Sequence, residues 1–241
     1  MAITTILFDL DGTLLPMDQE EFIRAYFSLL AKKLAPRGYD PKALYPALLA
    51  GIEAMVVNDG SRRNEEAFWS AFSAKLGERV RQELPLLEEF YRKEFQQVQQ
   101  VCGYSPHSRR LIDLLKQRGI RCILATNPLF PAVATESRIR WAGLSPEDFS
   151  LYTTYENSCF CKPNLQYYRQ ILAQFGLSGE ECIMVGNDVA EDMIAEALGM
   201  EVFLLTDCLI NKPCAELSRF PHGGFPELEQ FLLERIPPYN P

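Results

Sequence analysis

An apolar run near the start of the chain ends at two acidic residues. Residues 6–8, Ile-Leu-Phe, form a run too short for anything but a buried strand or a fragment of a core helix. Asp9 and Asp11 follow, and alternation along an extended chain puts residues i and i+2 on the same side. Gly12 then allows the backbone to turn sharply. We therefore expect the two carboxyl groups to face one centre where the strand ends.

The next stretch, residues 16–101, has a helical pattern throughout. Apolar residues recur at spacings of three and four, and clusters rich in Pro, Gly, Asn and Asp interrupt them. We expect four helices here: one with Asp18 as its N-cap, one around residues 44–56, one capped by Asn64, and one from about Pro85. No part of the stretch has a strand pattern, which indicates an inserted helical module.

From Ser105 onward the pattern alternates between helix and strand, which favours βαβ units and a parallel sheet. Strands are expected at residues 120–125, 151–154, 182–185 and 202–205. Helices are expected around residues 111–115 and at residues 131–141, 164–175, 189–198 and 226–233. The sequence thus predicts an α/β fold with a Rossmann-like parallel sheet core and an inserted all-helical cap domain.

The predicted domains are a core of residues 1–15 and 103–241 and a helical cap domain of residues 16–102. In open α/β sheets the ligand site lies beyond the carboxyl ends of the strands. Asp9, Thr126 and Asp188 all lie at the carboxyl ends of predicted strands. We therefore expect the functional site at that edge of the sheet.

Charge and composition narrow the class of partner. The 241 residues hold 32 acidic and 24 basic side chains, a formal net charge of −8. This charge disfavours nonspecific binding to nucleic acid or to an anionic membrane surface, but a small anionic ligand can still reach a locally positive site. No apolar stretch approaches the ~20 residues that span a bilayer, and no signal-peptide pattern opens the sequence. The seven cysteines are scattered in mostly apolar surroundings, as in reduced proteins, so we expect a cytoplasmic location.

Two carboxylates as close as Asp9 and Asp11 resist joint ionisation unless a cation lies between them. Mg²⁺ suits such a pair, because it prefers oxygen ligands and binds through one or two carboxylates together with phosphate oxygens and water. The first twelve or so residues therefore form a candidate site for a metal ion and a phosphate group.

Four segments follow one another along the chain: DLDGTL at residues 9–14, ILATN at 123–127, CKP at 161–163 and MVGNDVAEDM at 184–193. Together, and in this order, they resemble the four motifs of the haloacid dehalogenase-like (HAD) superfamily of phosphohydrolases and phosphomutases. The chain departs from many members by having Asn187 before Asp188, where glycine is common. The departure leaves the acidic residue in place.

The resemblance implies that Asp9 is both the nucleophile and a ligand of Mg²⁺. It makes Asp188 the second carboxylate ligand and the backbone carbonyl of Asp11 the third oxygen ligand. The phosphoryl group would pass to Asp9 as an aspartyl phosphate. Asp11 would protonate the leaving oxygen and then deprotonate the attacking water.

The resemblance also assigns groups that bind the substrate phosphate. Thr126 takes the position of the phosphate-binding hydroxyl, and Lys162 supplies the positive charge that stabilises the phosphate oxygens. Asn127 either contacts the substrate or shapes the turn before Pro128. Asp192 either orients Lys162, holds a metal-bound water, or is an ordinary acidic residue in the first turn of a helix.

The helical module resembles the C1-type cap of this superfamily, which closes over the site and excludes water, as lids do. Its loop NDGSRRN contains Asn58 and the basic pair Arg62 and Arg63. These three residues are our candidates for contacts with the rest of a small phosphorylated substrate. The alternative is a solvated charged loop with no role in binding.

The function implied is a magnesium-dependent phosphatase, a hydrolase that acts on a small phosphorylated metabolite. Asp11 argues against the dehalogenase branch of the superfamily, which needs no acid for an alcohol leaving group. A phosphomutase on a sugar phosphate remains an alternative, since it would use the same core residues. A noncatalytic regulatory protein with this fold is a further alternative. The loss of a motif residue would favour it, but the chain retains all four: Asp9, Asp11, Lys162 and Asp188. For the oligomeric state, we expect either a monomer or a homodimer.

Overall fold

The computed structural model describes residues 2–212 and 214–236, and its centre is a six-stranded sheet in the order β3-β2-β1-β4-β5-β6. All neighbouring strands pair in parallel, which confirms the predicted α/β, Rossmann-like fold. The strands are β1 (Thr5–Phe8), β2 (Arg121–Leu124), β3 (Leu151–Tyr152), β4 (Cys182–Gly186), β5 (Glu201–Leu205) and β6 (His222–Gly223).

Helices cover both faces of this sheet, as a parallel sheet requires. They are α5 (Pro106–Gln117), α6 (Ala132–Trp141), α7 (Leu165–Phe175) and α8 (Phe225–Leu233). Short 3₁₀ helices join them: η4 (Pro146–Asp148), η5 (Gly179–Glu181), η6 (Met193–Leu198) and η7 (Leu217–Arg219). In the central strand β1, Ile6 and Phe8 belong to the same apolar cluster as α5 and α8, whereas Leu7 belongs to the cluster of α7. This is the alternation that a strand buried on both faces imposes.

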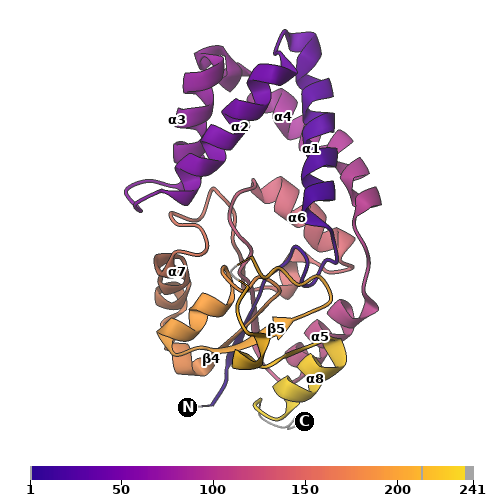
Figure 1. Cartoon of the computed structure of the whole chain (residues 1–241), viewed down its shortest axis with the longest axis vertical. Helices are drawn as coiled ribbons and strands as arrows, with labels where there is room; N and C mark the ends of the chain where they lie inside the picture. The colour runs from indigo at the N-terminus through magenta and orange to yellow at the C-terminus, as the bar shows by residue number, and fades with distance from the viewer. Residues whose placement is uncertain (1, 213, 237–241) are drawn as a thin grey trace.

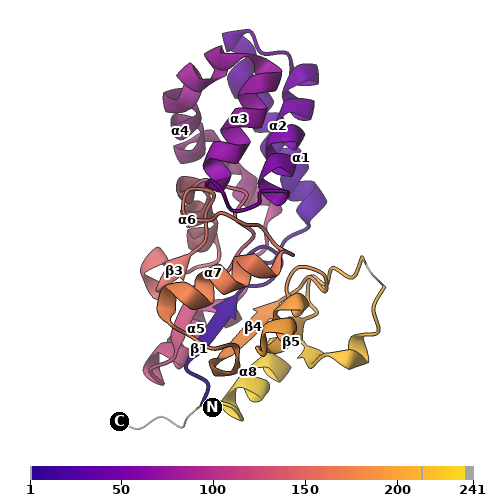
Figure 2. The ribbon, with the colours of Figure 1, turned by 90° about the vertical axis from the view of Figure 1, so that its left-hand side faces the viewer.

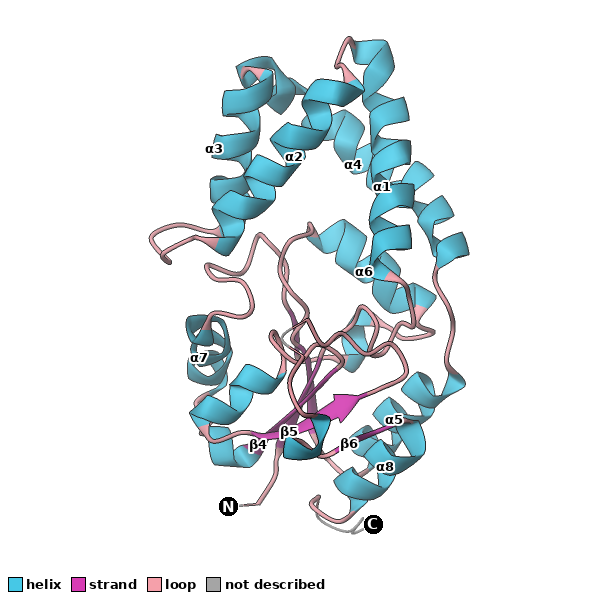
Figure 3. Cartoon of the chain, in the orientation of Figure 1, coloured by secondary structure: helices cyan, strands magenta, loops and turns pink. Residues whose placement is uncertain are grey.

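The segment between β1 and α5 is helical (Figure 1). Its helices are α1 (Gln19–Leu34), η1 (Ala35–Arg37), α2 (Pro41–Val56), α3 (Asn64–Leu76), η2 (Glu78–Glu83), α4 (Leu84–Arg92) and η3 (Glu94–Val101). Figure 2 shows α1 to α4 beyond the end of the sheet toward which the β1 arrow points. Figure 3, coloured by secondary structure, shows the strands gathered in the other half of the molecule.

Two paired linkers connect this helical segment to the sheet. Met17 and Cys102 form an antiparallel bridge, and the backbone N–H of Gly103 donates to the carbonyl of Pro16 at 2.7 Å. Phe22 of α1 packs edge-on against Phe130, which precedes α6, with ring centroids 6.0 Å apart. The apolar core is therefore continuous from the sheet into the helical segment.

The start of α1 follows the prediction. Asp18 is its N-cap, and the Asp18 carboxylate accepts from the N–H of Glu21 at 2.9 Å. Acidic residues occupy its first turn and basic residues its last, which suits the helix dipole. The buried side chains recur at the expected spacing: Phe22, Tyr26, Leu30 and Leu34.

The helix predicted at residues 189–198 is wrong in its first half. Only the 3₁₀ helix η6 forms there, and it starts at Met193. Asp188 is held by a β-bridge to Ile210, and the N–H of Val189 donates to the Ile210 carbonyl at 2.9 Å. With these contacts in place, residues 189–192 form turns where a regular helix was expected to begin.

The predicted capping role of Asn64 is also wrong. Arg63 stands at the N-cap of α3, and Asn64 is the first helical residue. The Asn64 amide instead donates to the carbonyl of Phe160 at 3.3 Å, in the loop that follows β3. The short edge strand β6 lacked any sequence prediction, since two residues carry no periodic signal.

All seven cysteines are free thiols. Across the residues that the structure covers, 2–212 and 214–236, no helix combines the length and the apolar character needed to cross a bilayer.

Asp148 in η4 ties this turn to α5. Its carboxylate lies 2.5 Å from Nη1 of Arg109 and 2.8 Å from Nζ of Lys116. Burial pushes the pKa of Asp148 upward, but the hydrogen bonds from Arg109 and Lys116 outweigh it and lower the pKa to about 2. A carboxyl whose pKa is depressed in the folded state stabilises the protein fully above its unfolded pKa of about 3.9, and this contribution is lost as the pH falls toward about 2.

We predict that Asp148→Asn lowers the free energy of unfolding by about 1–2 kcal/mol at about pH 7. Urea unfolding at about pH 7 and about pH 3 measures this, and the difference from wild type should narrow at the lower pH. Asp113→Asn is the control, because Asp113 also pairs with Arg109 but its side chain is 52% exposed. Equal losses in the two variants, or a loss that is independent of pH, would contradict the prediction.

Candidate active site

The register of the central strands brings the predicted site residues to one edge of the sheet. Phe8 is level with Leu124 of β2 and with Val185 of β4, so the residues that follow these strands emerge side by side. The N–H of Asp9 donates to the Val185 carbonyl at 2.9 Å, which extends the pairing to the first acidic residue. Asp9 is 7% exposed and lies between the chain segments that follow β2 and β4.

Lys162 is the cation around which the carboxylates of the site gather. Its side chain is fully buried, and its Nζ lies 2.9 Å from Oδ1 of Asp9 and 2.6 Å from Oδ1 of Asp192. Burial alone lowers the pKa of a lysine, but the charges of Asp192 and Asp9 reverse this and hold the pKa of Lys162 well above its ordinary value. The ammonium group therefore stays charged.

Asp192 uses both of its carboxylate oxygens within the protein. While Oδ1 accepts from Lys162, Oδ2 accepts from the backbone N–H of Asp188 at 3.0 Å. The close approach requires a glycine at position 186, because a Cβ on Gly186 would lie 2.0 Å from Asp192 Oδ2. Of the three predicted roles for Asp192, this geometry favours the orientation of Lys162.

The turn after Asp9 is built around Gly12 and Thr13. The Thr13 hydroxyl lies 3.3 Å from Oδ2 of Asp9 and 3.0 Å from Oδ1 of Asn187. Gly12 has φ +85°, and a Cβ there would lie 2.3 Å from Nδ2 of Asn187. Gly12 is therefore required both by its backbone conformation and by the close approach of the segment that follows β4.

Asp188 is held by the turn that it begins. Its Oδ1 accepts from the backbone N–H groups of Ala190 at 2.7 Å and Glu191 at 3.0 Å. These bonds leave Oδ2 for another partner. The β-bridge to Ile210 fixes the backbone of Asp188 on its other side.

Thr126 and Asn127 follow β2 and are fixed by different neighbours. Thr126 is buried, and its carbonyl accepts from the hydroxyls of Thr153 at 2.6 Å and Tyr167 at 2.9 Å. The Asn127 amide donates to Oε2 of Glu191 at 3.0 Å, and its Oδ1 is buried with no partner among the described residues. Asn127 thus connects the second and fourth motifs.

Asp11 has a partner that the sequence analysis missed. It forms an ion pair with Nη1 of Arg138, a residue of α6 that is 1% exposed. Burial raises the pKa of the Asp11 carboxyl, and the Arg138 guanidinium opposes this rise. A signal was available, since Arg138 lies one helical turn from the buried Ala134 on the same face of α6. A charged side chain at a core position needs a buried partner.

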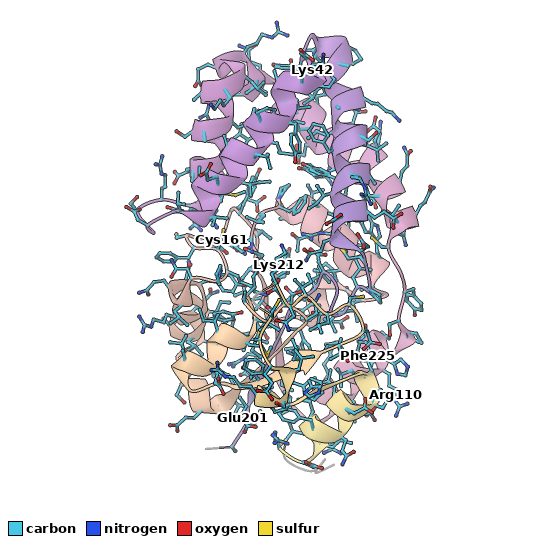
Figure 4. The ribbon with its side chains drawn as sticks, in the orientation of Figure 1. Lys42, Arg110, Cys161, Glu201, Lys212 and Phe225 are labelled. Carbon is cyan, nitrogen blue, oxygen red and sulfur yellow. The ribbon has the colours of Figure 1, made fainter. Side chains whose placement is uncertain are left out.

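The loop with the candidate cap residues touches the loop that carries Lys162. Figure 4 shows Cys161 at the level where the helical segment meets the sheet layer. Arg63 donates through Nη1 to the carbonyl of Glu156 at 2.8 Å, and Asn58 donates to the carbonyl of Arg62 at 2.9 Å inside its own loop. Asn58 and Arg63 thus hold this loop in place, Arg62 is exposed, and a substrate contact by any of the three stays a prediction.

The donor set suits a magnesium ion that has few protein ligands. In the described ranges, no group of three or more His, Cys, Asp or Glu side chains is arranged to hold a metal ion. The predicted set needs only the carboxylates of Asp9 and Asp188 and the main-chain oxygen of Asp11, with water and phosphate completing the coordination. Burial raises the pKa of Glu191 to about 7, and the charges of Asp188 and Asp9 add to the rise. A divalent cation would relieve this repulsion, so the residues fit the ion.

Solved structures of the same fold include phosphatases and a dehalogenase. A HAD phosphatase from Thermococcus onnurineus is 19% identical with a TM-score of 0.57, over 95% of this chain and 98% of that one. The protein YfnB from Bacillus subtilis, solved bound to magnesium, is 20% identical with a TM-score of 0.57, over 97% and 100%. The L-2-haloacid dehalogenase RSc1362 is 16% identical with a TM-score of 0.56, over 97% and 100%. At these identities the likeness shows the fold alone.

No curated protein matches the sequence. A family model described as haloacid dehalogenase-like hydrolase matches residues 3–198, which include β1, the helical segment and the chain as far as η6. The match contains all four sequence motifs and covers most of the chain. The protein therefore belongs to the haloacid dehalogenase-like hydrolases.

Proposed function

We propose that this protein is a magnesium-dependent phosphatase that hydrolyses a small phosphorylated metabolite through an aspartyl phosphate on Asp9. The observation that carries the proposal is the buried Lys162 ammonium, bonded to Asp9 and held by Asp192. A fixed positive charge beside a carboxylate nucleophile is the arrangement that an anionic phosphate ester needs, because its oxygens repel the attacking group.

Asp9, Asp188 and the carbonyl oxygen of Asp11 would hold Mg²⁺. The ion, when bound, supplies charge neutralisation for the phosphate oxygens. Lys162, in the loop after β3, would neutralise part of the negative charge on the phosphate oxygens. Thr126 would offer its hydroxyl to the phosphate from the end of β2. Thr13 and Lys162 together fix both oxygens of Asp9, which limits the rotation of the nucleophile.

In the proposed reaction Asp9 attacks phosphorus and the bond from phosphorus to the ester oxygen breaks. Asp11 gives its proton to that oxygen, so the leaving group departs as an alcohol. A water then attacks the phosphorus of the aspartyl phosphate and Asp11 takes a proton from it. The bond between Asp9 and phosphorus breaks, which releases inorganic phosphate and restores the two carboxyl groups.

Asp11 favours a phosphatase over a dehalogenase. A halide leaves as a stable anion, whereas an alkoxide is too basic to leave without a proton. The fold leaves this question open, since both kinds of enzyme have it. The carboxyl group of Asp11 therefore supports an oxygen leaving group.

We further propose that residues 16–102 act as a cap that closes the site to bulk water and selects the substrate. Its position beyond the carboxyl end of β1 and its contacts with the loop before Lys162 support this role. Asn58, Arg62 and Arg63 remain the candidates for substrate contacts. The net negative charge supports a small substrate and argues against nucleic acid.

We predict that the wild-type protein releases phosphate from at least one member of a panel of phosphorylated metabolites, and that Asp9→Asn lowers the rate by about 10³-fold or more. Release should require Mg²⁺ and stop in the presence of a chelator. The measurement is inorganic phosphate, with isomer formation and halide release from 2-chloropropionate followed in parallel. Asp113→Asn is the control. Halide or isomer as the main product, or turnover that survives in Asp9→Asn, would contradict the proposal.

We predict that Asp188→Asn weakens the binding of Mg²⁺ by more than about tenfold, because it removes a carboxylate oxygen ligand. Calorimetric titration with Mg²⁺ alone measures this without any turnover. Asp207→Asn, an exposed acid in the loop after β5, should bind the ion as wild type does. An unchanged titration for Asp188→Asn would remove Asp188 from the ligand set.

We predict that Asp192→Asn lowers the free energy of unfolding by about 2–4 kcal/mol, since it leaves the buried ammonium of Lys162 with one carboxylate in place of two. Urea unfolding measures the loss. Glu196→Gln is the matched control in η6, the 3₁₀ helix for which Asp192 is the N-cap, because the Glu196 side chain is 49% exposed in its pair with Arg219. Its loss should stay under about 1 kcal/mol. Equal small losses in both variants would show that Asp192 does not support Lys162.

A further inference from the structure

Arg138 is the largest of the side chains that are almost fully buried. A buried guanidinium is unfavourable unless it is paired and hydrogen-bonded. Among the described residues Asp11 is its one ion-pair partner. Replacing such a buried pair by apolar residues is often neutral or stabilising, so stability alone is a weak reason for its presence.

The guanidinium of Arg138 is held in one orientation by groups on several sides. Its Nη2 donates to Oγ1 of Thr135 at 3.3 Å, and its Nε donates to the carbonyl of Ala134 at 3.4 Å. Its central carbon lies 4.5 Å from the centroid of the Phe130 ring and 5.9 Å from that of Phe22. The remaining terminal nitrogen, Nη1, donates to Oδ2 of Asp11.

The two oxygens of Asp11 have different surroundings as a result. Oδ2 accepts from Arg138, whereas Oδ1 is buried and accepts no hydrogen bond from residues 2–212 and 214–236. A buried carboxylate oxygen without a partner is unfavourable in a finished structure and calls for an explanation. A carboxyl group that donates a proton needs one oxygen that is free to carry the proton, and a hydrogen bond to its other oxygen can fix its orientation.

We propose that Arg138 is a positioning residue for the acid–base step: it fixes Oδ2 of Asp11, so that Oδ1 carries the proton to the leaving oxygen and later receives one from water. The proposal rests on the proposed phosphatase function. Only Oδ1 is protonated in this scheme, and Oδ2 stays an acceptor for Nη1 in both protonation states. After the proton has left, the guanidinium stabilises the negative charge that remains on Asp11, close to Asp9.

A structural role and a positioning role differ in how they depend on the leaving group. The acid matters most when the departing oxygen is basic. Phenol, with a pKa of about 10, needs the proton more than the more acidic 4-nitrophenol does. Phenyl phosphate and 4-nitrophenyl phosphate have similar shapes, so the ratio of their kcat values isolates the contribution of the acid.

The experiment measures kcat and KM for both esters with Mg²⁺ in wild type, Arg138→Met, Arg138→Lys and Asp11→Asn. In Arg138→Met we expect kcat for phenyl phosphate to fall about 10²-fold, and kcat for 4-nitrophenyl phosphate to fall less than about tenfold. Asp11→Asn should show the same split, larger in size. Arg138→Lys keeps the charge but loses the planar fork, so it should lie between Arg138→Met and wild type. Arg140→Met, on the same helix and exposed, should leave both rates unchanged.

Equal losses on the two esters in Arg138→Met, or no loss on either, would overturn the positioning role and leave the proposed function intact. A wild type that releases no phosphate from any ester would overturn the proposed function and the positioning role together. If circular dichroism shows that Arg138→Met does not fold, the ratio of kcat for phenyl phosphate to kcat for 4-nitrophenyl phosphate in Arg138→Lys decides the question. A ratio equal to that of wild type would overturn the proposal.

Discussion

The arrangement of this protein depends on the need to keep several carboxylates together out of water. Asp9, Asp188 and Asp192 come from two neighbouring strands of a parallel sheet, whose carboxyl ends meet at one edge. Their repulsion in a buried site is large, and the ammonium of Lys162 offsets it from the loop after β3. In the proposed function, the carboxylate charge that Lys162 leaves unpaired would attract a cation, and the cation and Lys162 together would attract a phosphate. The electrostatic problem and the proposed chemistry therefore have one origin.

The carboxylates of the site also differ in the groups that their oxygens contact. Both oxygens of Asp192 accept hydrogen bonds, one from Lys162 and one from the backbone of Asp188. In Asp9, by contrast, Oδ2 accepts from the Thr13 hydroxyl. Asp11 turns away from Lys162 to a cation of its own, Arg138. In the proposed reaction this division assigns different tasks to acids that are only two residues apart. One is fixed as a nucleophile and the other as a proton carrier.

Much of the fold was predictable, because parallel strands and amphipathic helices leave a periodic signal in the sequence. The meeting of Asp9 and Asp188 at one edge of the sheet was predictable because both follow neighbouring strands, whereas Lys162, in the loop after β3, was predicted only from the resemblance to the family motifs. Arg138 was missed because its partner lies 127 positions away in the sequence. No local pattern records that distance. The helix expected at residues 189–198 failed for a similar reason, since the bridge from Asp188 to Ile210 joins two distant turns and overrides local propensity.

The helical segment has a second connection to the site besides its loop near Lys162. Phe22, in the first turn of α1, and Phe130 of the core both lie near the Arg138 guanidinium, with Phe130 the closer of the two rings. A movement of α1 away from the sheet would expose the guanidinium to water and weaken its hold on Asp11, because water competes for the same donors. The acid would then be best ordered when the helical segment is packed against the core. In the proposed mechanism, this contact would couple the exclusion of water by the helical segment to the ordering of Asp11, the group that would deliver the proton.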